Sequence, residues 1–190
     1  MKKTLLFILT IGLFASAAFA QRSAALGAAQ RVTGDRFTLV GRTPRGATFY
    51  AVRRPSAAML NAIDRGLTDL FAVARRNRYS RGLNYSNYTV FIARPDRTKN
   101  AAGEYSPDFA VGAAQYAGTD YDQGGYIYAA GMVVSFGPMA FVIADHDSNF
   151  QRVSDVVRYE GEHLVLYQND RRRYSQTADH SRGGGHPILQ

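Results

Sequence analysis

The C-terminal third of the chain contains a helical pattern whose apolar face is interrupted by a carboxylate. Apolar residues recur three or four positions apart, and this spacing places them on one face of an α-helix: Val153, Val156, Val157, Leu164 and Tyr167. Glu160 falls in the same stripe, where an apolar side chain would be expected. Because a buried carboxylate is costly unless it is paired or bound to a cation, the fold must supply a partner for it. The pattern therefore predicts a functional cluster around Glu160 on this helix.

Three of the four histidines lie on this helix or in the tail that follows it. His163 is on the predicted helix, whereas His180 and His186 come after it. Residues 181–185 between the two tail histidines are rich in glycine, so the tail can fold back on itself. The apolar residues at 187–189 indicate that the end docks on the domain. We therefore expect both tail imidazoles to approach His163.

The five residues from Tyr159 to His163 resemble the HExxH motif of the zincin metallopeptidases. Glu160 and His163 match the glutamate and the second histidine, and Tyr159 occupies the position of the first histidine. The reversed motif HxxEH aligns on the same residues, with Glu162 as the base. The order of elements, with a helix and a sheet before the motif helix, also resembles zincins. The resemblance implies a zinc-dependent hydrolase acting on a peptide or other amide bond.

Two ligand assignments follow from this cluster. In the first, His163, His180 and His186 bind zinc, Glu160 is the general base and Tyr159 donates a hydrogen bond to the oxyanion of the transition state. In the second, Glu160 and His163 both bind the metal together with one or both tail histidines, as Glu-x-x-His pairs do in carboxylate-bridged helix bundles.

Two simpler interpretations stand beside these assignments. Glu162 is four residues after Arg158, a spacing that predicts an ion pair on the helix surface. Without a metal, the cluster would be a buried hydrogen-bonded pair of Glu160 and His163, followed by a disordered tail. The histidines and glutamates would then have a structural role only.

The first twenty residues have the three parts of a secretory signal peptide. Lys2 and Lys3 form the charged start, residues 5–14 the apolar segment, and Ala18-Phe19-Ala20 a small-x-small cleavage site. We therefore expect a secreted or periplasmic bacterial protein that begins at Gln21. It has no cysteine, which excludes disulfides and thiolate metal ligands, and no later segment has the length of a membrane span.

Residues 21–190 are long enough for one domain, with a Gly-rich tail at 181–190. The sequence predicts an α+β fold with a mostly antiparallel sheet, a backing helix and the C-terminal motif helix. Residues 21–30 are expected to be loosely held. The expected strands are 36–41, 47–52, 88–93, 109–115, 126–136 and 139–144, and the backing helix begins at Ser56 and ends in the basic run at 75–78.

The charge balance suggests a second function. The net charge is +8, and removal of Lys2 and Lys3 lowers it to +6, with Lys99 as the one remaining lysine. Two runs, at 75–81 and 171–174, mix arginine with tyrosine, a combination that suits phosphate or nucleic acid. The alternative to an enzyme is a non-catalytic envelope protein that binds an anionic polymer and uses its His/Glu cluster structurally.

Overall fold

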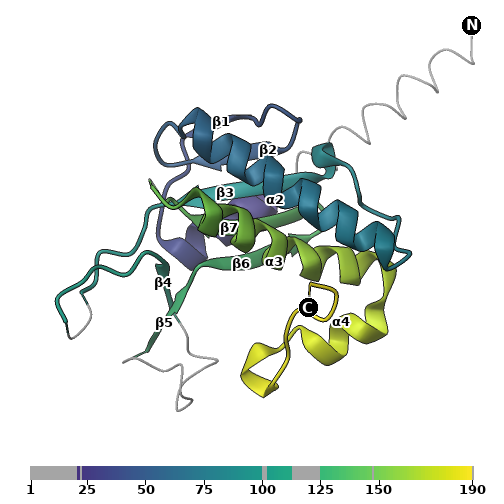
Figure 1. The fold of residues 1–190 in the computed structure, drawn as a ribbon. Helices are drawn as coiled ribbons and strands as arrows, with labels where there is room; N and C mark the ends of the chain where they lie inside the picture. The colour runs from purple at the N-terminus through teal and green to yellow at the C-terminus, as the bar shows by residue number, and fades with distance from the viewer. Residues whose placement is uncertain (1–20, 22, 100–101, 113–124, 147, 190) are drawn as a thin grey trace, which may run out of the picture.

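The computed structural model describes residues 21, 23–99, 102–112, 125–146 and 148–189 (Figure 1). The predicted signal peptide at 1–20 and the end of the predicted strand at 113–115 lie outside these residues. The α+β class is confirmed, with two long helices packed on one sheet. The strands are β1 (Leu39–Arg42), β2 (Thr48–Ala51), β3 (Tyr88–Ala93), β4 (Phe109–Gly112), β5 (Tyr126–Ala129), β6 (Gly131–Phe136) and β7 (Met139–Ala144). The α-helices that follow β2 are α2 (Ala57–Arg76), α3 (Phe150–Asn169) and α4 (Arg171–Thr177).

The main sheet is mixed rather than mostly antiparallel. Its strand order is β1-β2-β3-β7-β6, and β4 pairs with β5 in a separate two-stranded sheet. The outer pairs β1–β2 and β6–β7 are antiparallel, whereas β2–β3 and β3–β7 are parallel. The connection between β2 and β3 contains α2, and a crossover through a helix returns the chain in the same direction. The sequence pattern located these strands without revealing their directions.

Helices α2 and α3 lie side by side over one face of the sheet, as Figure 1 shows. Ser56 caps α2 as predicted, because its Oγ accepts a hydrogen bond from the backbone N–H of Met59. The helices approach closely at two glycines: a Cβ on Gly66 would lie 2.5 Å from the carbonyl oxygen of Ser154, and one on Gly161 would lie 2.4 Å from Leu70. The core between helices and sheet is therefore tight, which fixes the position of α3.

The opposite face of the sheet is covered by the N-terminal segment. Residues 23–33 are helical, and Ala25 and Ala29 are buried there beside Phe91 and Val142. The expectation of a loosely held N-terminus was therefore wrong. The small alanine side chains allow this helix to pack close to the sheet. The sequence alone does not distinguish such a packed helix from a flexible Ala-rich N-terminus.

The predicted strand at 126–136 is two strands. β5 pairs with β4, whereas β6 is the edge strand of the main sheet and pairs with β7. A β-bulge was expected at Gly131, but the register of β6 shifts between Val133 and Ser135 instead. None of the described helices has the length and apolar character needed to cross a bilayer.

Candidate metal centre

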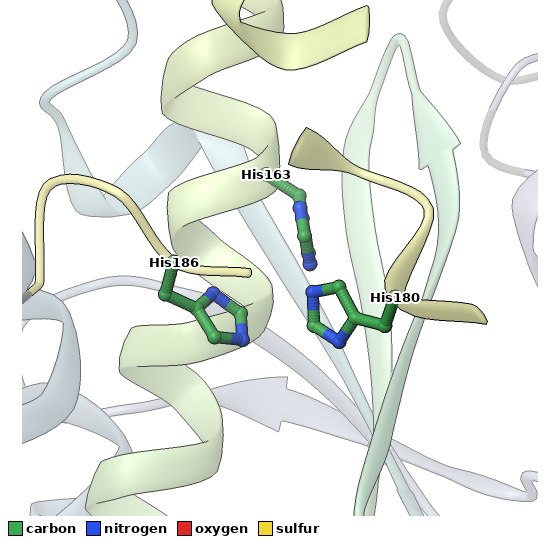
Figure 2. A group of neighbouring side chains, drawn as sticks. All are labelled: His163, His180 and His186. Atoms are coloured by element: carbon green, nitrogen blue, oxygen red, sulfur yellow. The ribbon is translucent and has the colours of Figure 1, made fainter. Parts of the chain in front are cut away.

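The predicted motif helix exists, and it carries His163 toward the C-terminal tail. α3 begins after Asn149, whose Oδ1 accepts a hydrogen bond from the N–H of Arg152 at 3.0 Å. His163 is buried on this helix. His180 begins a short 3-10 helix, η3 (His180–Arg182), and His186 follows in the folded-back tail. Figure 2 shows the three imidazoles converging from these separate segments.

The three imidazole rings form a nearly equilateral triangle. Their centroids are 5.1 Å apart for His163 and His180, 4.9 Å for His163 and His186, and 4.8 Å for His180 and His186. One nitrogen from each ring lies within 4.8 Å of the others. With Zn–N bonds of about 2.0–2.1 Å and tetrahedral angles, ring centroids would be separated by about 5 Å. The three histidines are therefore close enough to hold a metal ion.

The protonation states suit metal binding. Burial, and after it the charges of His186 and His180, together lower the pKa of His163 from 6.5 to about 3. Burial and His186 also lower the pKa of His180, against the opposite effects of Glu162 and Asp179. A histidine binds a metal through a neutral imidazole. Because the lowered pKa values keep His163 and His180 neutral near pH 7, neither ring has to release a proton before it binds a metal.

Glu160 and two of the histidines face one pocket. The pocket has a volume of about 380 Å³. Its polar lining includes Glu160, His163 and His180. The rest of the wall is mostly apolar and comes largely from β5 and β6, including Ile127, Met132, Val133 and Phe136. Among the described residues, the group that is close enough to hold a metal ion consists of the three histidines and does not include Glu160. The choice between the two ligand assignments stays a prediction.

Glu160 reaches the pocket across the edge strand. A Cβ on Gly131 would lie 2.5 Å from Cγ of Glu160, so a residue without a side chain is needed there. The backbone of Val133 forms a hydrogen bond with the carboxylate, which lowers its pKa, but burial is the larger effect and raises the pKa to about 8. The residue is half-buried overall, since it borders the pocket. Glu160 is thus held at the pocket by β6.

The prediction for Glu162 was wrong. Its side chain is fully buried, and Arg158 is near Asp155 instead, at 3.4 Å. Oε1 of Glu162 accepts a hydrogen bond from the backbone N–H of Ile188 at 2.9 Å, and Oε2 lies 3.1 Å from Nδ1 of His186. The second contact is within ion-pair distance but is not aligned as a hydrogen bond. The folded tail covers this side of α3, which sequence spacing alone could not reveal.

The tail is docked, as the sequence predicted. Ile188 is buried in the main core. The guanidinium of Arg173 donates to the carbonyl oxygen of Pro187 at 3.1 Å. Gly184 passes so close to the carbonyl oxygens of Thr177 and Asp179 that a Cβ would lie 2.4 and 2.6 Å from them. The absence of a side chain at Gly184 therefore allows the tight turn that brings the chain back toward α3.

Two tyrosines lie near the histidines. The ring of Tyr159 stacks on His186, with centroids 4.7 Å apart, and it is 37% exposed. Tyr174 on α4 lines the pocket and packs edge-on toward His163. Burial raises the pKa of Tyr174, and Tyr167 raises it further, whereas Arg171 lowers it. Sequence reasoning missed Tyr174, because its only local signal is an arginine run. The catalytic role of Tyr159 stays a prediction.

No family model matches this chain, and no curated protein or solved structure is significantly similar to it.

Proposed function

We propose that this chain is a zinc-dependent hydrolase that cleaves a peptide or other amide bond. The observation that carries the proposal is the triangle of His163, His180 and His186, two of which share a pocket with Glu160. Three neutral nitrogen ligands with one open position form the donor set of catalytic zinc sites, whereas structural sites use a fourth protein ligand. Zinc in such a site supplies Lewis acidity, which lowers the pKa of a water molecule to about 7.

The side chains near the metal centre would supply the remaining catalytic groups, namely a general base and a hydrogen-bond donor to the oxyanion. Glu160 accepts the proton of the attacking water and returns it to the leaving nitrogen as the C–N bond breaks. A phenol, Tyr174 or Tyr159, donates a hydrogen bond to the carbonyl oxygen as negative charge develops on it. The apolar wall formed by β5 and β6 receives a side chain next to the scissile bond.

The proposal includes export and an extracytoplasmic substrate. Residues 1–20 have the composition of a signal peptide. A peptide, or the peptide portion of a cell-wall polymer, would meet such an enzyme outside the cytoplasm.

Glu160→Gln tests this function against a purely structural cluster. The amide has the same shape but cannot take a proton, so the variant should keep zinc and lose hydrolysis by about 100-fold or more. Glu104→Gln, a substitution of an exposed glutamate, is the matched control. Release of amines from a mixed peptide and peptidoglycan-peptide library is the readout. Equal activity in Glu160→Gln and the parent, or no hydrolysis by the zinc-loaded parent, would contradict the proposal.

A further inference from the structure

Two arginine-rich segments that are about 90 residues apart in sequence lie together in the fold, beside the metal centre. Asn169 at the end of α3 joins them: its Oδ1 accepts hydrogen bonds from the N–H groups of Arg81 (2.9 Å) and Ser80 (3.2 Å), and its Nδ2 donates to the carbonyl oxygen of Arg81 (3.0 Å). The hydroxyl of Tyr79 donates to Asp170, which caps α4. Figure 1 shows α2 and α3 ending on the same side of the molecule, where α4 begins.

We name the resulting surface the arginine face. It consists of the exposed arginines at the end of α2, in the loop after it and at the start of α4: Arg75, Arg76, Arg78, Arg81, Arg171 and Arg172. Among the described residues, none of these six guanidinium groups has a carboxylate at ion-pair distance. Arginines elsewhere do, including Arg94 with Asp35 at 2.6 Å. The positive charge of this face is therefore not neutralised within the described chain.

Helix dipoles explain only part of the arginine face. Arg75 and Arg76 lie in the last turn of α2, where a positive charge is favourable. Arg171 and Arg172 follow the C-terminal end of α3, where a positive charge is favourable, but they also lie in the first turn of α4, where it is unfavourable. Arg78 has φ of 62°, a conformation that costs an arginine free energy and a glycine none. Local stability therefore does not account for the full set of arginines.

The chemistry of the face favours phosphate over other anions. The planar guanidinium presents paired N–H donors that match two phosphate oxygens, whereas an ammonium group does not. The face contains no lysine. Cζ of Arg171 lies over the ring of Tyr167, 3.2 Å from its centroid, and this cation–π contact holds the guanidinium in position without a carboxylate.

We propose that the arginine face binds a polymer that carries repeated phosphate groups. Six unpaired cations on two adjoining segments suit several phosphates of one chain better than a single small anion. The face adjoins the metal centre, because Tyr174 of the pocket is on the same helix as Arg171 and Arg172. A bound polymer would thus be retained next to the pocket. This inference does not depend on hydrolysis.

Binding to labelled polyphosphate, measured by fluorescence anisotropy at several salt concentrations, tests the proposal. The variant replaces Arg75, Arg76, Arg171 and Arg172 by glutamine. The matched control replaces four exposed arginines elsewhere, Arg31, Arg36, Arg54 and Arg97, and so has the same net charge. Both are compared with the parent chain, zinc-loaded and chelator-treated, after their melting temperatures have been checked. Oligothymidylate is the second phosphate source, and polyglutamate is the carboxylate probe.

The parent and the control should bind polyphosphate or oligothymidylate, with or without zinc. The arginine-face variant should bind about tenfold or more weakly at physiological salt. A plot of the logarithm of its binding constant against the logarithm of the salt concentration should have a slope that is shallower by about three, because four phosphate contacts are lost. The tighter of the two phosphate probes identifies the source. Equal weakening of variant and control, no binding by the parent, or polyglutamate bound as tightly as the phosphate probes would each overturn the proposal. Failure of zinc binding alone would leave it standing.

Discussion

Oε1 of Glu162 accepts a hydrogen bond from the backbone N–H of Ile188 at 2.9 Å, and this contact joins the motif helix to the C-terminal tail. The other carboxylate oxygen lies 3.1 Å from Nδ1 of His186. One buried carboxylate thus touches both the anchor of the tail and one of its histidines. A proton on Nδ1, facing Glu162, leaves Nε2 of His186 free to bind a metal. Glu162 therefore has the position of a residue that orients a ligand.

Glu162→Gln and Glu162→Ala should separate the two roles of this carboxylate. Glutamine can still accept the N–H of Ile188 but loses the charge near His186, so zinc affinity should fall about 10- to 100-fold with a small change in stability. Alanine also leaves the N–H of Ile188 without a partner and should lower the free energy of unfolding by about 2–3 kcal/mol. Urea unfolding and zinc titration measure both effects. Asp69→Ala, at an exposed position, should change neither.

Deletion of residues 181–190 tests whether the tail is part of the domain. The truncated chain loses His186 and exposes the core that Ile188 covers, which alone is worth about 1.5–3 kcal/mol. We expect loss of zinc and a lower urea midpoint, both with and without added metal. A truncated protein that unfolds within about 0.5 kcal/mol of the parent would show that the tail contributes nothing to the domain.

Glu160 should make the metal-free protein less stable as the pH rises. Its pKa is raised from 4.5 to about 8 by burial, so between these values the folded state binds more protons than the unfolded state. Stability from this group is present below about pH 4.5 and is lost as pH rises toward 8. Glu160→Gln removes the effect, and its stability advantage should grow to on the order of 1–2 kcal/mol at pH 8.

The control for this experiment is the zinc-loaded protein. A nearby divalent cation favours the ionised carboxylate, so the advantage of Glu160→Gln at pH 8 should shrink when zinc is bound. Thermal unfolding of both proteins from pH 5 to pH 8 measures the difference. A stability difference that does not change with pH would mean that Glu160 ionises normally.

The two tyrosines near the centre can be compared by removal of their hydroxyls. Tyr174→Phe should lower kcat by about 10- to 100-fold with little change in KM, because Tyr174 lines the pocket and donates to charge that develops only in the transition state. Tyr159→Phe keeps the ring that stacks on His186, so kcat should stay within a few-fold of the parent value. The reverse pattern would assign the oxyanion contact to Tyr159.

Those features of the candidate metal centre that depend on residues close together in sequence could be predicted from the sequence. The apolar spacing located α3, the glycines before His186 indicated a folded tail, and the apolar residues at 187–189 indicated that the tail docks on the domain. Glu162 was misassigned because a spacing of four residues says which side chains share a helix face, but not what covers that face. The sheet shows the same limit. Local patterns located β3 and β7, whereas their parallel pairing depends on the path of the chain between them.

Zinc content across four histidine variants tests the central claim most directly. His163→Ala, His180→Ala and His186→Ala each remove one corner of the triangle, whereas His146→Gln alters the remaining histidine, which lines a different pocket. Elemental analysis after zinc-supplemented expression and gel filtration should find about one zinc per chain in the parent and in His146→Gln, and much less than one in the other three. A parent without any transition metal, or three alanine variants that retain the full amount, would contradict a metal centre built from His163, His180 and His186.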